Sequence, residues 1–243
     1  MHVLSRKLRA LHNLSEDEES AILDALGAPE VVAAGCDIAS DGDAPSQSTV
    51  LLSGVACRSK IMIDGRRQIL AFQFPGDFSD LYAYVLKRLD HSIMAMSSCT
   101  VARVPHEVLS RLAAKFPNLA YTLWRDTMVD SSIFQMWLVN VGQRPALARL
   151  AHLLCEQFFR LQAVGLARRG EAISLPITQE DLADATGMST VHVNRTMQEL
   201  RRRGLVGRNP TALEILDWHG LAHVAGFDAA YLHYRHFDSE AGQ

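Results

Sequence analysis

The strongest constraint on the fold is a pair of helix signals that follow each other in the second half of the chain. Thr178 can cap a helix whose third residue is Asp181, which is the spacing of a capping box, and Gly187 can stop that helix in a left-handed conformation. Ser189 can cap a second helix directly afterwards, and Gly204 can end it. A short helix, a tight turn and a second helix predict a helix-turn-helix.

The second of these helices has two chemically distinct faces. Val193, Met197 and Leu200 are spaced so that they form one apolar stripe, which we expect to pack inward. The opposite face carries amide, guanidinium and small apolar groups, at Val191, Asn194, Arg195, Gln198, Arg201 and Arg202. Such groups suit base edges, since arginine matches guanine, asparagine matches adenine and an apolar side chain contacts the thymine methyl. The helix therefore predicts binding to double-stranded DNA.

Positive charge gathers in the same part of the chain. The whole chain has a formal net charge of -3. Residues 143–210 hold ten arginines, no lysine and six acidic residues, a balance of +4, which leaves 14 basic and 21 acidic residues, or -7, elsewhere. The three consecutive arginines at 201–203 are expected to contact phosphates, which would make the affinity depend steeply on salt.

A small hairpin is predicted after the helix-turn-helix. Two short apolar runs, at 205–206 and 213–216, are joined by the sequence GRNP at 207–210, which favours a turn. The domain is therefore expected to be winged. The tail from residue 219 starts with a helical pattern and then becomes rich in histidine and aromatic residues, and its role is not indicated by the sequence.

The first half of the chain has the pattern of short strands. Between residues 31 and 105, apolar runs of strand length, at 49–52, 69–74 and 100–104, alternate with turn signals that contain Gly, Asp or Pro. Regular spacing of this kind predicts an antiparallel barrel or sandwich. Before it, Ser15 followed by acidic residues from Glu16 onward indicates a helix start.

A single long helix is predicted between the two halves, opening at Pro117-Asn118 and running to about Val141. Its second half is apolar on nearly every side, so one packing partner would not cover it. We expect one face to contact the first domain and another to contact a second copy of the chain, through Leu123, Thr127, Asp130, Phe134, Trp137 and Val141. A buried helix in a monomer remains the alternative.

These patterns predict an α+β protein. Its length of 243 residues favours two domains with separate cores. The expected parts are an antiparallel, jelly-roll-like β-roll at 1–117, a long helix and hinge at 118–142, a winged helix-turn-helix at 143–218 and a tail at 219–243.

This order of parts resembles the Crp/Fnr family of bacterial transcription regulators. The resemblance is most specific in TQEDLA at 178–183, GMS at 187–189, VNRT at 193–196 and GLV at 204–206. It implies a homodimer on a palindromic site, with recognition helices in successive major grooves, and RNA polymerase as a further partner. The predicted DNA-binding residues are Thr178, Gln179, Ser189, Thr190, Val191, His192, Asn194, Arg195, Gln198, Arg201 and Arg202.

The first domain is similar to the family's cyclic-nucleotide-binding β-roll, through SGV at 53–55 and PGDF at 75–78. Nucleotide binders carry Phe-Gly-Glu-Leu and an arginine before a small residue, whereas this chain has FSDL at 78–81 and HS at 91–92. The missing glycine and arginine disfavour a cyclic nucleotide. We therefore predict an unidentified effector at Phe78, Ser79, Asp80, His91 and Ser92.

No cofactor is assigned from the sequence. The four cysteines, Cys36, Cys57, Cys99 and Cys155, are too widely spaced to indicate an iron-sulfur cluster, a zinc knuckle or a disulfide framework. His219, His223, His233 and His236 could meet only if the tail folds back, so no metal site is predicted. Heme is left open.

The remaining classes of function have little support in the sequence. There is no signal peptide and no long apolar segment, so we expect a cytoplasmic protein without a membrane partner. Phosphate loops, nucleophile elbows and metalloprotease motifs are absent from the sequence, so we expect no enzyme. The alternative that stays open is a ligand- or partner-binding module with a vestigial helix-turn-helix.

Overall fold

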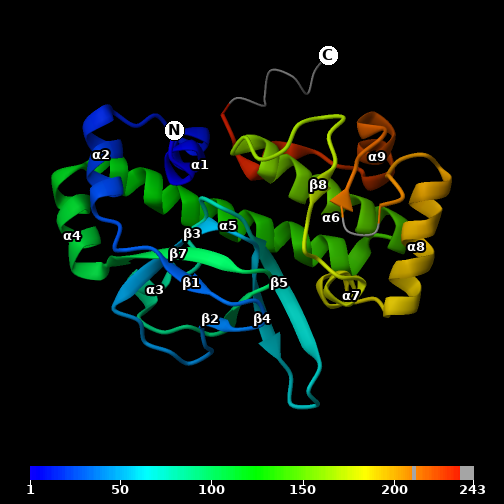
Figure 1. Ribbon diagram of the computed structural model, residues 1–243, viewed down its shortest axis with the longest axis horizontal. Helices are drawn as coiled ribbons and strands as arrows, with labels where there is room; N and C mark the ends of the chain where they lie inside the picture. The colour runs from blue at the N-terminus through cyan, green and yellow to red at the C-terminus, as the bar shows by residue number, and fades with distance from the viewer. Residues whose placement is uncertain (210–211, 236–243) are drawn as a thin grey trace.

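The structure is a computed structural model of the chain, and it describes residues 1–209 and 212–235. Two N-terminal helices precede a β-roll, a long helix follows, and a mainly helical half completes the fold (Figure 1). This order confirms the predicted α+β class and the predicted sequence of parts.

The N-terminal helices are α1 (Val3–Leu11) and α2 (Glu16–Asp24). Ser15 caps α2 with a capping box, because its hydroxyl accepts from the Glu18 amide while the Glu18 carboxylate accepts from the Ser15 amide. The predicted helix start at Ser15 is therefore confirmed. Helix α1 was not predicted, although its fully buried leucines recur at helical spacing, at Leu4, Leu8 and Leu11.

The β-roll consists of two antiparallel sheets, with strand orders β1-β7-β3 and β2-β6-β4-β5. The strands are β1 (Glu30–Val32), β2 (Asp37–Ala39), β3 (Gln47–Ser53), β4 (Ala56–Ile61), β5 (Arg67–Gln73), β6 (Ser92–Ala95) and β7 (Cys99–Pro105). The three strand runs predicted from the sequence fall on β3, β5 and β7. A short helix, α3 (Ala83–Leu86), lies between β5 and β6 along the chain.

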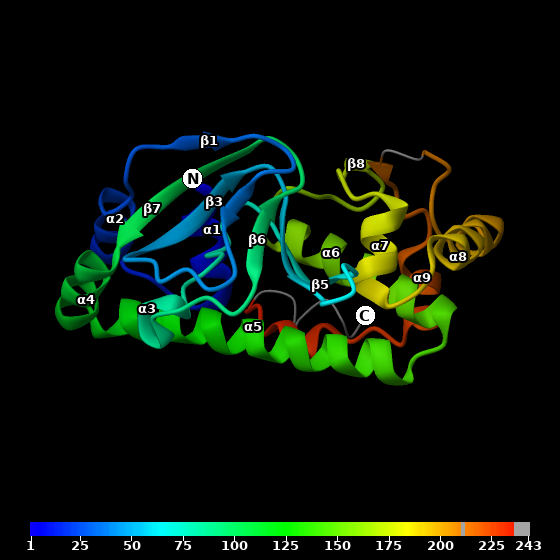
Figure 2. The same cartoon turned by 90° about the horizontal axis from the view of Figure 1, so that it is seen from below.

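Helix α4 (His106–Lys115) leads into the predicted long helix, α5 (Pro117–Gln143). Pro117 lies in the first turn of α5, where its missing N–H would have had no partner in the helix. Figure 2 shows α5 running along the β-roll and on beneath the C-terminal half. Among the described residues, no helix is both long enough and apolar enough to cross a membrane.

The C-terminal half contains the predicted helix-turn-helix. Its elements are α6 (Ala146–Ala163), β8 (Ile173–Ser174), α7 (Gln179–Thr186), α8 (Thr190–Arg202), β9 (Ala212–Leu213), α9 (Trp218–Ala225) and the 3-10 helix η1 (Ala229–Leu232). Thr178 and Asp181 form the expected capping box, and Gly187 ends α7 with a φ of 66°. Ser189 caps α8, as predicted, and Gly204 follows it with a φ of 71°.

The two runs after α8 pair antiparallel, as the predicted hairpin requires. Val206 and Ile215 form a bridge, and the Gly207 amide donates to the Glu214 carbonyl oxygen at 2.8 Å. The wing also contains a further pair of strands, because β9 pairs with β8. Strand β8 was not predicted, because it is only two residues long and precedes the helix-turn-helix. Part of the predicted turn, at Pro210, lies outside the described residues.

A continuous hydrophobic core joins the two halves, while two further buried clusters lie within the first half and α5, so separate cores are found only in part. One buried cluster contains Phe72 of β5, Phe74 directly after it, Trp137 of α5, Phe158 of α6 and Leu200 of α8. The physical reason is α6, whose residues from 150 to 161 are all buried. A helix that is buried all round packs on both neighbours at once.

The C-terminal segment, residues 226–235, folds back onto the rest of the molecule and is not a separate tail. Leu232 and Tyr234 are buried, and the Arg235 amide donates to the Ala10 carbonyl oxygen at 2.9 Å. His236, one of the histidines considered for a metal, lies outside the described residues. Within residues 1–209 and 212–235, no group of three His, Cys, Asp or Glu side chains could hold a metal ion.

Candidate DNA-binding surface and sensor site

The recognition surface is a shallow hollow of about 450 Å³ on the outer side of α8. It is lined by Gln179 of α7 and by Thr190, Val191, Asn194, Arg195 and Gln198 of α8. Val193 and Leu200 are fully buried on the opposite side, and Met197 is half-buried. The predicted division of α8 into an inner stripe and an outer polar face is therefore confirmed for residues 190–200, whereas Arg201 turns toward the wing.

Two side chains of this surface are presented outward. Val191 is 71% exposed. Arg195 is exposed and, among the described residues, forms no hydrogen bond or ion pair, so its guanidinium group can meet a base edge. The exposed valine offers methyl groups at the same hollow, which suits contact with a thymine methyl.

Two predicted contact residues at the helix starts, Thr178 and Ser189, have other roles in the chain. The Thr178 hydroxyl accepts from the Asp181 amide and donates to the Asp181 carboxylate at 2.7 Å. The Ser189 hydroxyl accepts from the His192 amide at 3.3 Å. These hydroxyls cap the two helices, whereas the exposed His192 side chain remains open to solvent.

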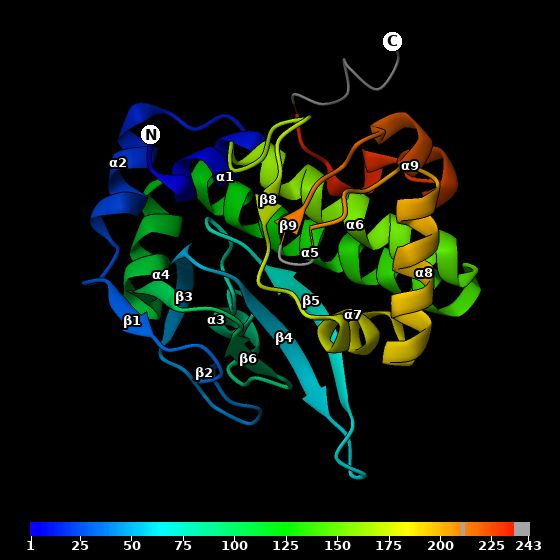
Figure 3. The ribbon, with the colours of Figure 1, turned by 45° about the vertical axis from the view of Figure 1, so that its right-hand side comes forward.

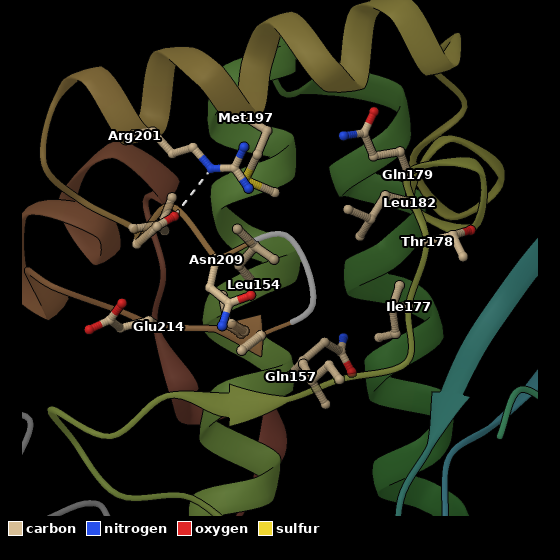
Figure 4. A pocket seen from close by; sticks show the side chains of 15 residues that line it. Leu154, Gln157, Ile177, Thr178, Gln179, Leu182, Met197, Arg201, Asn209 and Glu214 are labelled. Atoms are coloured by element: carbon tan, nitrogen blue, oxygen red, sulfur yellow. Dashed lines mark hydrogen bonds between the residues drawn. The ribbon is translucent and has the colours of Figure 1, made fainter. Parts of the chain in front are cut away.

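The predicted phosphate contacts, residues 201–203, are partly engaged within the chain. Figure 4 shows Arg201 turned toward the wing, where its Nε donates to the Gly207 carbonyl oxygen at 3.2 Å. Arg202 and Arg203 both bond Glu199, and these hydrogen bonds lower the pKa of Glu199 to about 2. Glu199 therefore offsets part of the positive charge at this end of α8.

A small cavity of about 110 Å³ lies behind α8, between α6, α7 and the wing (Figure 4). Its walls include Leu154, Leu182 and Met197, together with the amide of Gln157. Arg201 also borders it, so this arginine belongs to the seam between α8 and the wing. Arg201 is therefore not part of the recognition surface on the outer side of α8.

Helix α7 is fixed against the β-roll through the hairpin formed by β4 and β5, and Figure 3 shows the two side by side. Arg67 at the start of β5 bonds Asp181 at 2.5 Å and Asp184 at 2.7 Å. Gln68 donates to the Asp184 carbonyl oxygen at 2.7 Å. The first helix of the helix-turn-helix is thus in direct contact with the first domain.

A second, buried connection is the Asp77 cluster, which we define as Lys7, Asp77, Asp126 and Arg160. Asp77 follows β5, and its two carboxylate oxygens lie 2.7 Å from Lys7 of α1 and 2.8 Å from Arg160 of α6. Burial raises the pKa of Asp77, but the charges of Lys7 and Arg160 outweigh burial and lower it to about 2. Asp126 of α5 lies 3.6 Å from Lys7.

The predicted effector residues lie close together, but their polar groups are largely used inside the chain. Phe78, Ser79, Asp80 and His91 are all buried. Asp80 accepts from the Thr49 amide and hydroxyl, and burial raises its pKa to about 6. These groups hold the loop after β5 against β3.

The last two residues of the predicted effector set, His91 and Ser92, are also hydrogen bonded within the chain. His91 bonds the Tyr82 hydroxyl at 3.2 Å and the Asp90 carboxylate at 2.8 Å. Burial, followed by the charge of Arg58, lowers the pKa of His91 and favours its neutral form. The Ser92 hydroxyl accepts from the Asp41 amide at 3.1 Å.

Sequence reasoning missed the residue at the centre of this site, Arg58 of β4. Its guanidinium group is buried and donates to the carbonyl oxygens of Ser79 and Phe78 at 2.9 and 3.2 Å. It also pairs with Asp130 of α5 at 2.9 Å and lies over the Phe134 ring. The sequence signal was weak, because an arginine at this place in a short strand reads as an ordinary surface residue.

The exposed apolar face of α5 is not the predicted dimer face. Around the axis of α5, at 100° per residue, the exposed apolar residues lie within an arc of about 100°. The centre of this arc is about 120° around the helix from the centre of the predicted dimer contacts. The exposed apolar residues are Tyr121, Trp124, Met128, Leu138 and Val139.

Three of the predicted dimer contacts are used within the chain. Leu123 and Trp137 are 8% and 6% exposed, and Asp130 pairs with Arg58. Thr127, Phe134 and Val141 are half-buried at the edge of the exposed stripe. The apolar pattern alone could not show which face the β-roll and α6 would cover.

Models of known protein families match both halves of the chain. The family model described as a Crp-like helix-turn-helix domain matches residues 148–224, and the one described as a cyclic nucleotide-binding domain matches residues 29–116. The nitrogen fixation regulation protein FixK of Azorhizobium caulinodans is 31% identical over 185 residues, which cover 76% of this chain and 73% of the relative. The chain belongs to the Crp/Fnr family of bacterial transcription regulators.

Two further comparisons agree with this assignment. The transcriptional activator protein FnrL of Cereibacter sphaeroides is 25% identical over 229 residues, covering 91% of this chain and 90% of the relative. The structure of FixK2 from Bradyrhizobium japonicum superposes with a TM-score of 0.72 at 22% identity, covering 83% of this chain and 98% of that one, and so shares the fold.

The residues of this family member do not fit a cyclic nucleotide. Ser79 and Asp80 are buried, and Asp80 is bonded to Thr49. The buried cation, Arg58, already has Asp130 as its partner. A nucleotide phosphate would have to compete with that carboxylate, and removing either partner of a buried pair is costly.

Proposed function

We propose that the protein is a homodimeric transcription regulator that binds a palindromic DNA site through α8. The observation that carries this proposal is the recognition surface, where six side chains with base-reading chemistry line one hollow. Arg195 suits guanine and Val191 suits a thymine methyl. Membership of the Crp/Fnr family supports the same function.

The proposed dimer interface is the exposed stripe of α5, which contains Trp124, Met128 and Leu138. It continues into an apolar groove of about 430 Å³ beside α3 and α4. Burying this stripe against its copy would remove large apolar side chains from water. In a dimer that binds a palindrome, the two α8 helices would need to lie one helical turn of DNA apart, roughly 34 Å.

Replacing Trp124 with Glu is expected to weaken the dimer at least about tenfold, because a charge would enter an apolar interface. Trp124 is 63% exposed in one chain, so the folded monomer should tolerate the change. Sedimentation over a concentration series would measure the dissociation constant. Ala114→Glu, at an exposed position of α4, serves as the control that adds the same single negative charge. An unchanged dimer in the Trp124 variant would place the interface elsewhere.

The proposed partners and compartment follow the relatives. FnrL is named a transcriptional activator, which supports contact with RNA polymerase in this protein. A cytoplasmic location follows from the proposed function, because the DNA and the polymerase are there. We further propose that an unidentified signal acts through the β-roll.

Two routes could carry that signal to the helix-turn-helix. One is the junction of α5 and α6 at 140–144, where the Asn140 side-chain amide donates to the Arg149 carbonyl oxygen at 3.1 Å. The other is the direct contact of Arg67 with α7. A shift in either would move α8 relative to its copy and change the spacing of the two half-site contacts.

Replacing Arg195 with Ala is expected to cost about 1 to 3 kcal/mol in binding to the preferred site and to relax the choice of base at one position per half-site. Arg202→Ala is the matched control, because Arg202 is exposed but bonded to Glu199. It should weaken binding to all DNA more evenly. Fluorescence anisotropy with specific and random duplexes at one salt concentration would separate the two effects. Equal losses on both duplexes for both variants would contradict the base-reading role.

The experiment that tests the proposed function is selection of bound duplexes from a random library, at fixed moderate salt and without added effector. Enrichment of a palindrome with half-site centres about one helical turn apart is the expected result. Weak, salt-sensitive binding without enrichment would contradict sequence-specific binding in this state and favour a module with a vestigial helix-turn-helix.

A further inference from the structure

Three amide side chains of the recognition surface are hydrogen bonded in a row. The Asn194 Nδ2 donates to Oε1 of Gln179 at 2.9 Å, and the Gln198 Nε2 donates to Oδ1 of Asn194 at 2.9 Å. The row runs from the first residue of α7 to the third turn of α8. Asn194 is half-buried in its centre, whereas Gln198 is exposed.

The row leaves a defined set of free groups on the central amide. An asparagine amide has two N–H donors and an oxygen with two lone pairs. The two hydrogen bonds use one donor and one lone pair of Asn194. One donor and one acceptor therefore remain. Reversing the direction of all three amides leaves the same count.

One donor beside one acceptor is the complement of adenine. In the major groove adenine presents N7 as an acceptor and the N6 amino group as a donor, whereas guanine presents two acceptors and cytosine presents an amino donor. A freely rotating asparagine amide would lose conformational entropy when it binds a base. Gln179 and Gln198 already restrict the Asn194 amide before binding. Such preorganisation favours selective recognition.

We infer that Asn194 reads an adenine in each half-site and that Gln179 and Gln198 are positioning residues that fix its amide. This inference rests on the proposed function and deepens it. It changes the predicted role of the two glutamines, which the sequence pattern treated as direct DNA contacts. Because Asn194 is the neighbour of Arg195 in the same hollow, the adenine should lie close to the guanine that Arg195 reads.

The test uses the full-length protein and the palindrome selected by the wild type, with every base pair of one half-site replaced in turn. Anisotropy titrations give the ratio of affinities for adenine over other bases at each position. Asn194→Ala is expected to reduce that ratio by about 5- to 150-fold at one position. Gln198→Met and Gln179→Met keep the side-chain length, remove the amide, and should reduce the ratio at that same position by a smaller factor.

A double-variant comparison separates positioning from direct contact. Once Asn194 is Ala, adding Gln198→Met should change the ratio at that position no further, because Gln198 acts only through Asn194. Gln198→Asn would not reach across the same gap and should behave like Gln198→Met. Glu180→Gln, at an exposed position next to Gln179, is the control and should leave every ratio unchanged.

The outcomes distinguish failure of this inference from failure of the proposed function. If the wild type selects a palindrome but Asn194→Ala keeps its preference for adenine at every position, only the inference is overturned. If Gln198→Met alters a different base pair from Asn194→Ala, then Gln198 reads DNA directly and its positioning role is wrong. If the wild type shows no sequence preference at all, the proposed function fails and the inference fails with it.

Discussion

Replacing Asp77 with Asn is expected to destabilise the folded chain by about 3 to 5 kcal/mol, because it removes a carboxylate that two buried cations share. Lys7 and Arg160 lie 2.7 and 2.8 Å from its oxygens, and all three side chains are less than one-tenth exposed. An amide preserves the shape without the charge, so the two cations would repel each other in a site of low dielectric. Urea unfolding at pH 7 would measure the difference.

Asp64→Asn is the control for this prediction. Asp64 pairs with Arg66 at the exposed turn between β4 and β5, and an exposed pair contributes little because solvent and salt screen it. The control should unfold close to the wild-type urea concentration. An Asp77→Asn variant as stable as the wild type would show that the Asp77 cluster contributes no net stability.

The acid limb of stability offers an independent check on Asp77. Its pKa is about 2 in the folded chain and about 3.9 in an unfolded one. The stabilisation from this ionised group is therefore fully present above pH 4 and is lost as the pH falls from about 4 toward 2. The wild type should lose this contribution over that interval, and the Asp77→Asn variant should lack it.

The position of the Asp77 cluster gives it a role beyond stability. Lys7 belongs to α1, Asp77 follows β5, and Arg160 belongs to α6 of the DNA-binding half. The Arg160 guanidinium group also donates to the Phe72 carbonyl oxygen at 3.0 Å. The cluster therefore fixes the DNA-binding half against the β-roll, and its loss should loosen the whole arrangement as well as lower its stability.

The parts of the fold that were predictable are those specified by local chemistry. Thr178, Gly187 and Ser189 mark helix ends through the hydrogen bonds of their own neighbourhood, and all three act as expected. Strand and helix periods also depend on near neighbours along the chain. The helix-turn-helix, the long helix and the β-roll could therefore be predicted from short stretches of sequence.

The parts that were not predictable depend on which surfaces meet. Trp137 looks like a dimer contact in the sequence, yet its indole N–H donates to the buried Glu156 at 2.9 Å. Arg201 looks like a phosphate contact, yet it bonds the wing. Glu156 lies 19 positions from Trp137, and Gly207 lies in a turn whose conformation the sequence does not specify. Helical periodicity therefore could not have indicated either partner.

The sensor site shows the same limit in a different form. The departures from the nucleotide-binding pattern at 78–81 and 91–92 disfavour a cyclic nucleotide, which stays a prediction, and they could not show which groups fill the site instead. The pair formed by Arg58 and Asp130 joins β4 to α5, and those residues are 72 positions apart. Only the fold brings the two together.

Replacing Asp130 with Ala is expected to destabilise the chain by about 3 kcal/mol, because Arg58 would stay charged and buried without its carboxylate. Adding Arg58→Met should recover much of that loss, since the double variant leaves no buried charge behind. Thermal and urea unfolding of the two variants and the wild type would measure both effects. Ser131→Ala, at the next position of α5, is the control. Ser131 is exposed, so this change should alter stability little.

The double variant also tests how the sensor site is closed. If Asp130→Ala destabilises the chain because Arg58 is left unpaired, the double variant must be more stable than Asp130→Ala alone. If the double variant is no more stable, the lost stability comes from packing around α5 instead. Because Arg58 is already paired with Asp130 and is not available to a phosphate, excess cyclic AMP should leave the melting temperature of the wild type unchanged. A clear rise in that temperature would mean that Asp130 yields its partner to the nucleotide, and the site would then be a working nucleotide sensor.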